Sequence, residues 1–217
     1  MKAKSARSKR GRPRAFDEET ALNRALEVFW RKGYEGASLP DLEAAMGINR
    51  PSMYAAFGNK EALFRKALTR YREGPAGYVR EALAEPSARA VAERVLLGAA
   101  DLLTDRRHPR GCLMVQGALA CGEGAESVRK ELAAHREAGV SALRRRFERA
   151  RSEGDLPAGA SPADLARFLA TVVHGMSVQA SGGATRAQLR RVAEMALRAW
   201  PARKSHELEV MSRSRSG

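Results

Sequence analysis

The chain has 217 residues, of which 44% are hydrophobic and 29% charged, a balance that excludes a wholly disordered protein and suits one or two globular domains. Alanine occurs 40 times, leucine 21 times and arginine 31 times, whereas isoleucine occurs once and threonine five times, so a sheet-rich protein is excluded and an all-α fold is expected. The net charge of +14 favours a polyanionic partner, either nucleic acid or an acidic membrane surface.

The N-terminal segment holds a large part of this positive charge. Residues 1–14 carry seven basic side chains and no acidic one, and we expect residues 1–15 to form a disordered basic arm. No apolar stretch follows the arm, which argues against a secretory signal peptide, and the sequence has no run of about 18 apolar residues that could cross a membrane. With only two cysteines, the sequence indicates a cytoplasmic protein without a membrane partner or a disulfide scaffold.

Apolar spacing, capping residues and glycine or proline breaks predict about nine helices after the arm. Ser38, Asn49 and Asn59 are the expected N-caps of the second, third and fourth helices. The expected ranges are 17–32, 39–46, 50–57, 60–73, 87–104, 112–121, 125–153, 162–180 and 185–200.

The most informative segment is residues 38–57, with the sequence SLPDLEAAMGINRPSMYAAF. It predicts two short helices joined by a tight turn, in which Gly47 supplies the required positive φ. A helix-turn-helix of this kind places its second helix in the major groove of DNA, where the base edges differ. An ordinary corner between two helices, with no DNA role, is the alternative interpretation, and the basic arm and the net charge favour DNA.

Several stretches of the N-terminal part form a recognisable pattern: Arg12-Pro13-Arg14, Ala25 to Phe29, Gly33-Tyr34, Leu42 to Ile48, Ser52-Met53-Tyr54 and Phe57 to Leu63. Through these stretches, residues 12–65 resemble the N-terminal domain of the TetR family of bacterial transcriptional regulators. The resemblance implies a homodimer that binds palindromic double-stranded operator DNA and is released by a small-molecule effector. It also implies a helix-turn-helix DNA-binding domain at 16–60, a helical ligand-binding and dimerisation domain at 61–202 and a flexible tail at 203–217.

By the same resemblance, Tyr54 and Lys60 would hold phosphates, while Arg50 and its neighbours would meet base edges or adjacent phosphates. Ala55-Ala56 departs from the family, in which a bulky or polar residue often precedes the phenylalanine. The loss of contacts from this position makes the basic arm and Arg50 more important for DNA affinity. The full expected DNA-binding set is Arg12, Arg14, Ser38, Asn49, Arg50, Pro51, Ser52, Tyr54 and Lys60.

The C-terminal part resembles the family in plan only, so its sites are expectations drawn from apolar helix faces. A ligand pocket is expected to include Cys112, Val115, Leu119, Phe168, His174 and Met176. A dimer interface is expected on the helices 162–180 and 185–200, at Leu165, Leu169, Val172, Leu189, Val192, Met195 and Ala196.

Cys112 gives an alternative in which a thiol replaces the small-molecule effector. Three arginines precede it within six residues, and cations and a helix N-terminus both lower the pKa of a thiol.

His108 lies four residues before Cys112, but Pro109 and the lack of a third ligand argue against a metal site. An α-helical enzyme is a remote alternative, since no catalytic motif supports it, and no cofactor is expected.

Overall fold

A computed structural model describes residues 16–119 and 125–201 of the chain. The predicted arm and tail, and with them Arg12 and Arg14, lie outside these residues. Every regular element in the described ranges is helical, which confirms the all-α class. The helices are α1 (Glu18–Gly36), α2 (Leu39–Met46), α3 (Arg50–Phe57), α4 (Lys60–Glu73), the 3₁₀ helix η1 (Pro75–Gly77), α5 (Tyr78–Ala82), α6 (Ala88–Thr104), α7 (Leu113–Leu119), α8 (Glu126–Ser152), α9 (Pro162–Ser181) and α10 (Arg186–Arg198).

The helix starts follow from short polar side chains, as predicted. Ser38, Asn49 and Asn59 each accept a hydrogen bond from a backbone N–H in the first turn of the helix that they cap. Ser161 caps α9 in the same way, and Thr185 forms a capping box with Gln188 at α10. These caps satisfy backbone donors that have no partner inside the helix.

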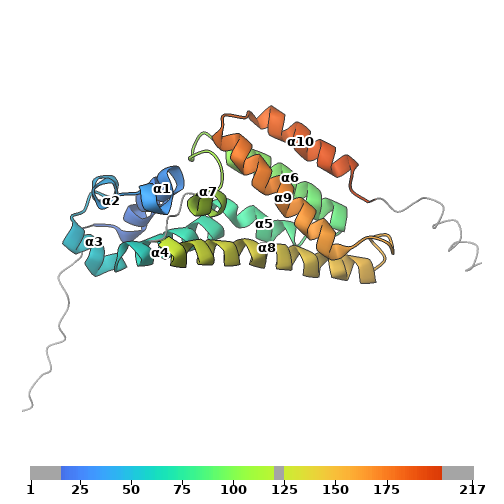
Figure 1. The fold of residues 1–217 in the computed structure, drawn as a ribbon, viewed down its shortest axis with the longest axis horizontal. Coiled ribbons are helices and arrows are strands. Elements are labelled where there is room, and N and C mark those ends of the chain that lie inside the picture. Colours follow the sequence, from blue (N-terminus) through green and yellow to red (C-terminus); the bar gives the residue numbers. More distant parts are fainter. Residues whose placement is uncertain (1–15, 120–124, 202–217) are drawn as a thin grey trace, which may run out of the picture.

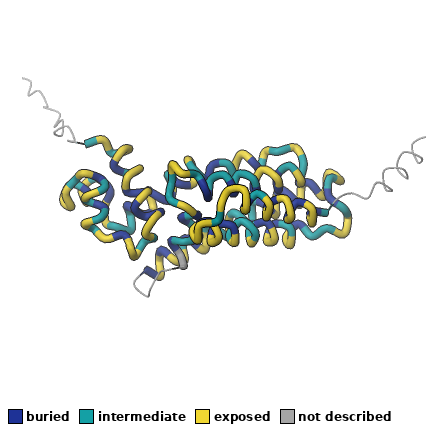
Figure 2. The backbone as a smooth tube through the Cα atoms, turned by 90° about the horizontal axis from the view of Figure 1, so that it is seen from above, coloured by how far each residue is buried: buried dark blue, intermediate teal, exposed yellow. Residues whose placement is uncertain are grey.

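The helices are arranged along one long axis (Figure 1). The three helices α1 to α3 gather at one end, and α6, α9 and α10 lie at the other, while α4 and α8 run along the length of the molecule. The burial pattern alternates along each helix, with one face buried and the other exposed (Figure 2). None of the described helices is long and apolar enough to cross a membrane.

Two apolar cores hold this arrangement together. The first is built on α1 to α4 and also takes Leu113 from α7 and Leu132 from α8, so the small helical bundle is tied to the rest of the chain. The second lies between α6, α8, α9 and α10 and is centred on side chains such as Phe147 and Leu169. Helix α4 places Leu63 and Tyr71 in the first core, and the predicted division between residues 60 and 61 stays a prediction.

The structure has two short elements that the sequence did not predict, η1 and α5, between α4 and α6. The Gly74-Pro75-Ala76-Gly77 stretch was expected to be a break, but Pro75 starts the 3₁₀ turn and α5 follows directly. Helix α1 was expected to stop at Gly33. It is interrupted there, with φ of 70° and ψ of −179°, and then continues for one further turn to Gly36.

Candidate nucleic-acid interface

The turn between α2 and α3 fixes how α3 is presented. Gly47 has φ of 70° and ψ of 28°, the left-handed conformation that was predicted for it. Leu42 of α2 and Met53 and Phe57 of α3 are buried in the first core, so one face of each short helix is held inward. The opposite face of α3 is therefore left on the surface.

That outer face carries the polar groups expected to touch DNA. The ring of Tyr54 is 41% exposed, and Arg50 and Pro51 are exposed in the first turn. The Arg50 guanidinium is paired with Glu43 of α2, with 3.2 Å between Nε and Oε1. Because the Arg50 side chain is 47% exposed, solvent weakens this pair, and the guanidinium can exchange Glu43 for a phosphate or a base.

Two predicted residues have capping roles that occupy their side chains. The Asn49 carboxamide oxygen accepts from the Ser52 N–H at 2.9 Å. The Ser38 hydroxyl lies 2.7 Å from Asp41 Oδ2 and also accepts from the Asp41 N–H. These groups fix the starts of α3 and α2, so their first effect is to position the helices.

Lys60 is the first residue of α4, as expected, but its side chain is not free in solvent. Its ammonium lies 4.6 Å from the centre of the Tyr34 ring, and partial burial lowers its pKa. The site therefore combines a cation with the free N–H groups of a helix N-terminus, a pairing that suits a phosphate.

The charge of this end of the chain is distributed unevenly. Residues 16–60 contain five basic and seven acidic side chains, whereas residues 1–14 contain seven basic and no acidic ones. The helices that present α3 are thus slightly acidic as a group. A polyanion would gain its main electrostatic attraction from the N-terminal segment.

A small, partly open apolar cavity of about 110 Å³ lies among α4 to α9. Three of the predicted pocket residues line it: Cys112, Val115 and His174. Phe168 does not, because it lies on the outer face of α9, and Met176 is packed in the second core instead. Leu119 ends α7, and its side chain lies outside the described part of the chain.

Most of the residues that line the cavity were not predicted as pocket residues from the sequence, among them Tyr71, Tyr78, His135, Arg136 and Gly139. Three of them lie on one face of α8, at the spacing that a helix uses for its inward side. That spacing could have identified the face, but not the neighbouring helices that it meets. Tyr78 belongs to α5, which was not predicted at all.

The pKa of the Cys112 thiol differs from the prediction. Burial raises this pKa, and this outweighs the Tyr71 hydroxyl and the Val115 and Met114 N–H groups, which lower it. Two of the three arginines before Cys112 have other partners, because Arg107 pairs with Asp105 and the guanidinium of Arg110 donates to the Ala184 carbonyl. The direction of the pKa shift is therefore opposite to the one predicted.

His108 has a packing role. Its ring stacks on Trp30 with 5.2 Å between the ring centres. In the described parts of the chain, no three His, Cys, Asp or Glu side chains are placed to hold a metal ion.

The outer faces of α9 and α10 carry most of the large hydrophobic side chains that are exposed in the described part of the chain. Four of the five large hydrophobic side chains that the described residues expose lie on these two helices: Phe168, Val178, Val192 and Met195. Of the predicted interface residues, Val192 and Met195 are exposed and Leu165 and Val172 are half-buried. Leu169, Leu189 and Ala196 are buried within the same chain, in the second core.

A helix-turn-helix with an exposed second helix, carried on a larger helical domain, defines a DNA-binding regulator. Residues 21–67 match the family described as "Bacterial regulatory proteins, tetR family", and residues 86–196 match the "Tetracyclin repressor-like, C-terminal domain". The chain therefore belongs to the TetR family of bacterial regulatory proteins.

Individual relatives agree with this membership. The chain is 32% identical to the HTH-type transcriptional repressor ComR of Escherichia coli (strain K12), over 88% of this chain and 92% of that protein. It is 30% identical to the repressor BdcR of the same organism, over 86% of this chain and 90% of that protein. These relatives are named as transcriptional repressors, not enzymes, and the enzyme alternative is set aside.

Solved structures show the same fold. The TetR family transcriptional regulator CifR, a cysteine mutant complexed with 26bp double-strand operator DNA, is 47% identical, with a TM-score of 0.85. The match covers 88% of this chain and all of that one. A TetR regulator from Rhodococcus sp. RHA1 is 42% identical, with a TM-score of 0.59, over 85% of this chain and all of that one.

Proposed function

We propose that the chain is a homodimeric repressor that binds a palindromic operator and leaves it when a small molecule occupies the C-terminal domain. The main support for DNA binding is the outer face of α3, where Arg50 and Tyr54 are exposed on a helix whose other face is buried. An exposed polar face on a rigidly held short helix suits the major groove. The operator complex of the similar regulator CifR supports the same assignment.

The DNA-binding residues divide into two groups by their present contacts. Ser38 and Asn49 are engaged as caps and act by positioning. Arg50, Tyr54 and Lys60 are proposed to contact bases or phosphates directly, and Arg50 would have to leave its ion pair with Glu43 to do so. Arg12 and Arg14 belong to the basic segment that supplies attraction to the phosphate backbone.

The test is fluorescence anisotropy on a duplex selected from a randomised library by the parent protein. Lys60→Ala removes one phosphate ligand and should reduce the dependence of log affinity on log salt by about one unit. Arg50→Ala should cost about 1–3 kcal/mol and relax the preference at one base position. Deletion of residues 1–14 should weaken binding to every duplex. Arg144→Ala, which removes an exposed arginine on α8, is the control and should leave operator affinity unchanged.

If Lys60→Ala, Arg50→Ala and the deletion of residues 1–14 also leave operator affinity unchanged, the proposed set of DNA-contacting residues is refuted.

The outer faces of α9 and α10 support a two-fold dimer. Met195 is 66% exposed and Val192 41% exposed on the same face of α10, and Phe168 is 39% exposed on α9. Solvent exposure of this many large apolar groups on adjacent helices is typical of a surface that a second copy covers.

Val192→Glu combined with Met195→Glu should convert the protein to a monomer in sedimentation velocity at micromolar concentration. The same protein should lose operator affinity because one reading helix alone contacts half a site. Arg191→Glu, also exposed on α10, is the control. A parent protein that is already a monomer at this concentration refutes the dimer.

The raised pKa of the Cys112 thiol, which burial causes, weighs against the thiol-sensing alternative, because the thiolate is the reactive form. We therefore favour a non-covalent effector. A gel shift with a thiol-reactive electrophile, for the parent and Cys112→Ser, separates the two. Release of DNA from the parent alone would restore the alternative.

A further inference from the structure

The residues that line the apolar cavity indicate what kind of molecule it can bind. Its volume is about 110 Å³, comparable with about four water-sized or methylene-sized groups. The lining comes from α4, α5, α6, α7, α8 and α9, so the cavity lies where the DNA-binding end of the chain meets the C-terminal helices. Most of the lining side chains are aliphatic or aromatic, including Val95, Leu103, Val140 and Val173.

A few polar groups accompany these apolar walls. The Tyr71 hydroxyl donates to Cys112 Sγ at 3.2 Å, and the Cys112 N–H donates to the Ser177 hydroxyl at 2.9 Å. His174 and Tyr78 also line the cavity, and neither side chain has a hydrogen bond to another residue in the described ranges. An occupant with one hydrogen-bonding group would find a partner there.

The charges around the cavity disfavour a cationic occupant. Among the described residues no Asp or Glu lines the cavity, and Arg136 is the one arginine or lysine in its lining. Its Nη1 donates to the Met114 carbonyl at 2.6 Å. Burial lowers the pKa of both His135 and His174; Arg72 lowers the pKa of His135 further while Glu131 raises it, and Arg136 and Arg167 lower the pKa of His174 further.

An anionic occupant is disfavoured for a different reason. Arg136 is the one guanidinium in the lining, its Nη1 already donates to the Met114 carbonyl, and the walls around it are mainly aliphatic and aromatic, so a buried negative charge would lose its hydration with little return. The raised pKa of the Cys112 thiol, which burial causes, agrees with this cost. A carboxylate in the same cavity would meet the same cost. The walls therefore favour an uncharged molecule.

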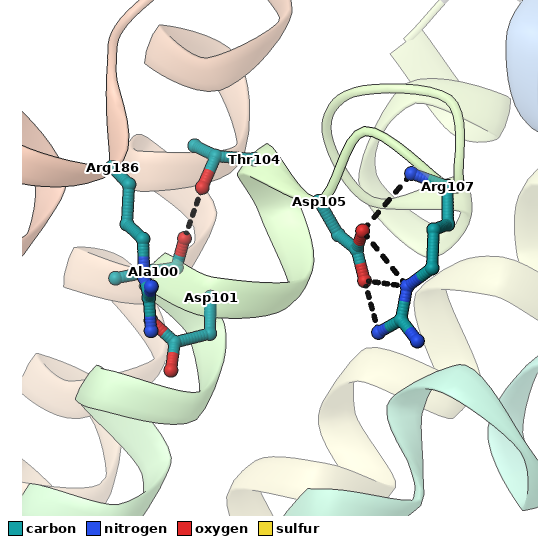
Figure 3. Close-up of polar contacts among 6 residues, drawn as sticks. All are labelled: Ala100, Asp101, Thr104, Asp105, Arg107 and Arg186. Atoms are coloured by element: carbon teal, nitrogen blue, oxygen red, sulfur yellow. Dashed lines mark hydrogen bonds and ion pairs between the residues drawn. The ribbon is translucent and has the colours of Figure 1, made fainter.

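Two side chains limit the length of any occupant. Tyr78 and Leu102 line the cavity, and both also line an open groove of about 970 Å³ on the outside of α6. This outer groove is charged: Asp101 pairs with Arg186 at 2.6 Å and Asp105 with Arg107 at 2.7 Å (Figure 3). The Tyr78 ring lies against Gly98, where an added Cβ would come within 2.5 Å of it, so Tyr78 is a fixed part of the wall between the two spaces.

We propose that the apolar cavity binds a small uncharged molecule, with an apolar body of about four carbons and one hydrogen-bonding group, and that Tyr78 and Leu102 set its maximum length. The identification of this molecule as the effector rests on the proposed function. The binding chemistry itself does not.

The first experiment compares three probes of one size and different charge: butan-1-ol, butyrate and butylammonium. Their binding to the full-length dimer is measured by calorimetric titration without DNA at pH 7. Butan-1-ol should bind at least about tenfold more tightly than either ion, because each ion must lose its hydration on entry. Equal or tighter binding of butyrate or butylammonium overturns the proposal.

The second experiment fills the cavity from α8. Gly139 lines the cavity, and a Cβ added to it would meet nothing within 4 Å. Gly139→Leu should therefore fold normally and lose butan-1-ol binding by at least about tenfold. Ala138→Leu adds the same side chain at the neighbouring exposed position and should leave binding intact. Undiminished binding in Gly139→Leu overturns the site.

The third experiment truncates Tyr78 and Leu102, the two side chains that line both the cavity and the outer groove. Tyr78→Ala and Leu102→Ala open the wall between the two spaces from two different helices and should admit hexan-1-ol and octan-1-ol, which the parent rejects. Tyr78→Phe keeps the ring and should keep the limit. If the parent binds octan-1-ol as tightly as butan-1-ol, or if neither alanine variant extends the limit, the role of the wall is refuted.

DNA affinity is measured separately with each probe. If butan-1-ol binds as expected but operator affinity does not change, the cavity proposal stands and the effector part of the proposed function fails. If DNA binding fails altogether, the calorimetric result still decides the cavity proposal.

Discussion

Arg146 is the one charged side chain among the described residues that is almost fully buried, with 6% of its surface exposed. Its Nη2 donates to the Glu85 carbonyl at 2.7 Å. Its Nε and Nη1 have no hydrogen-bond partner within the described part of the chain. A buried guanidinium with two unsatisfied donors costs free energy of desolvation that one hydrogen bond does not return.

We therefore expect Arg146→Met to raise the free energy of unfolding by about 1 kcal/mol, since methionine keeps an apolar stem of similar length. Urea unfolding of both proteins measures the difference. Arg145→Met, at the exposed neighbouring position, should stay within about 0.5 kcal/mol of the parent. A loss of more than about 1 kcal/mol in Arg146→Met would mean that the guanidinium is satisfied by a group that stabilises the fold.

His174 makes stability depend on pH near neutrality. Burial, Arg136 on α8 and Arg167 on α9 all lower its pKa, so the unfolded chain binds this proton more readily than the folded chain. Its contribution is fully present above the unfolded pKa of about 6.5 and is lost as pH falls through the folded pKa. The carboxyl groups whose pKa is lowered, such as Asp41 at about 2, lose their contribution only at more acidic pH.

The thermal unfolding midpoint of the parent should therefore fall between pH 7.5 and pH 5.5. His174→Gln, which cannot take up a proton, should show a smaller fall over the same range. His135, whose pKa is also lowered, accounts for part of the remainder. An identical pH dependence in the two proteins would contradict the prediction.

At the scale of the elements, the turn between α2 and α3 depends on one backbone conformation. Gly47 has φ of 70°, and a Cβ there would be 3.5 Å from the Arg24 guanidinium, which is ordinary contact. The cost of a side chain at this position is therefore strain in the backbone, not a clash.

Gly47→Ala should lower the free energy of unfolding by about 1–2 kcal/mol, the cost of holding an L-residue in the left-handed region. Gly139→Ala is the matched substitution within helix α8, where the new Cβ has open space, and it should raise stability by about 0.5–1 kcal/mol. Differential scanning calorimetry of the pair measures both. Two changes of the same sign would contradict the assignment of strain to Gly47.

The elements show why some features could be predicted from the sequence and others could not. Ser38, Asn49 and Gly47 act on their own turn, so the signal and its effect lie within a few residues. Phe168 and Leu169 are both apolar and adjacent on α9, and only the packing of α8 and α6 against that helix decides which is buried. The same holds for Cys112, whose local surroundings lower its pKa while the tertiary fold raises it.

At the scale of the whole molecule, Trp30 is one of the contacts that connect the DNA-binding end with the cavity. Trp30 of α1 donates its Nε1–H to the Gly111 carbonyl at 2.9 Å, and this bond is buried. The same ring packs edge-on against Tyr71, with 4.6 Å between ring centres, and Tyr71 bonds to Cys112 in the cavity wall. A ligand that moves this wall acts on the helix that supports α2 and α3.

If butan-1-ol acts as the proposed effector, binding at the two sites is linked in both directions, so the factor by which butan-1-ol weakens operator binding equals the factor by which operator weakens butan-1-ol binding. Trp30→Phe keeps an aromatic ring against Tyr71 and His108 but removes the donor to Gly111. We expect the linkage factor to fall towards one, while operator affinity without butan-1-ol stays within about threefold, because no DNA-contacting group is lost.

Trp200→Phe is the matched control for this substitution. Trp200 packs on Phe147 in the second core, and its Nε1 has no hydrogen-bond partner in the described ranges, so the variant loses an indole N–H without breaking a bond between the two ends. Its linkage factor should equal that of the parent. Equal linkage in Trp30→Phe and the parent, or equal loss in both tryptophan variants, would show that the Gly111 bond does not carry the coupling. In that case the contact between α4 and α8, where Arg65 pairs with Glu131 at 2.7 Å, would be the next route to remove.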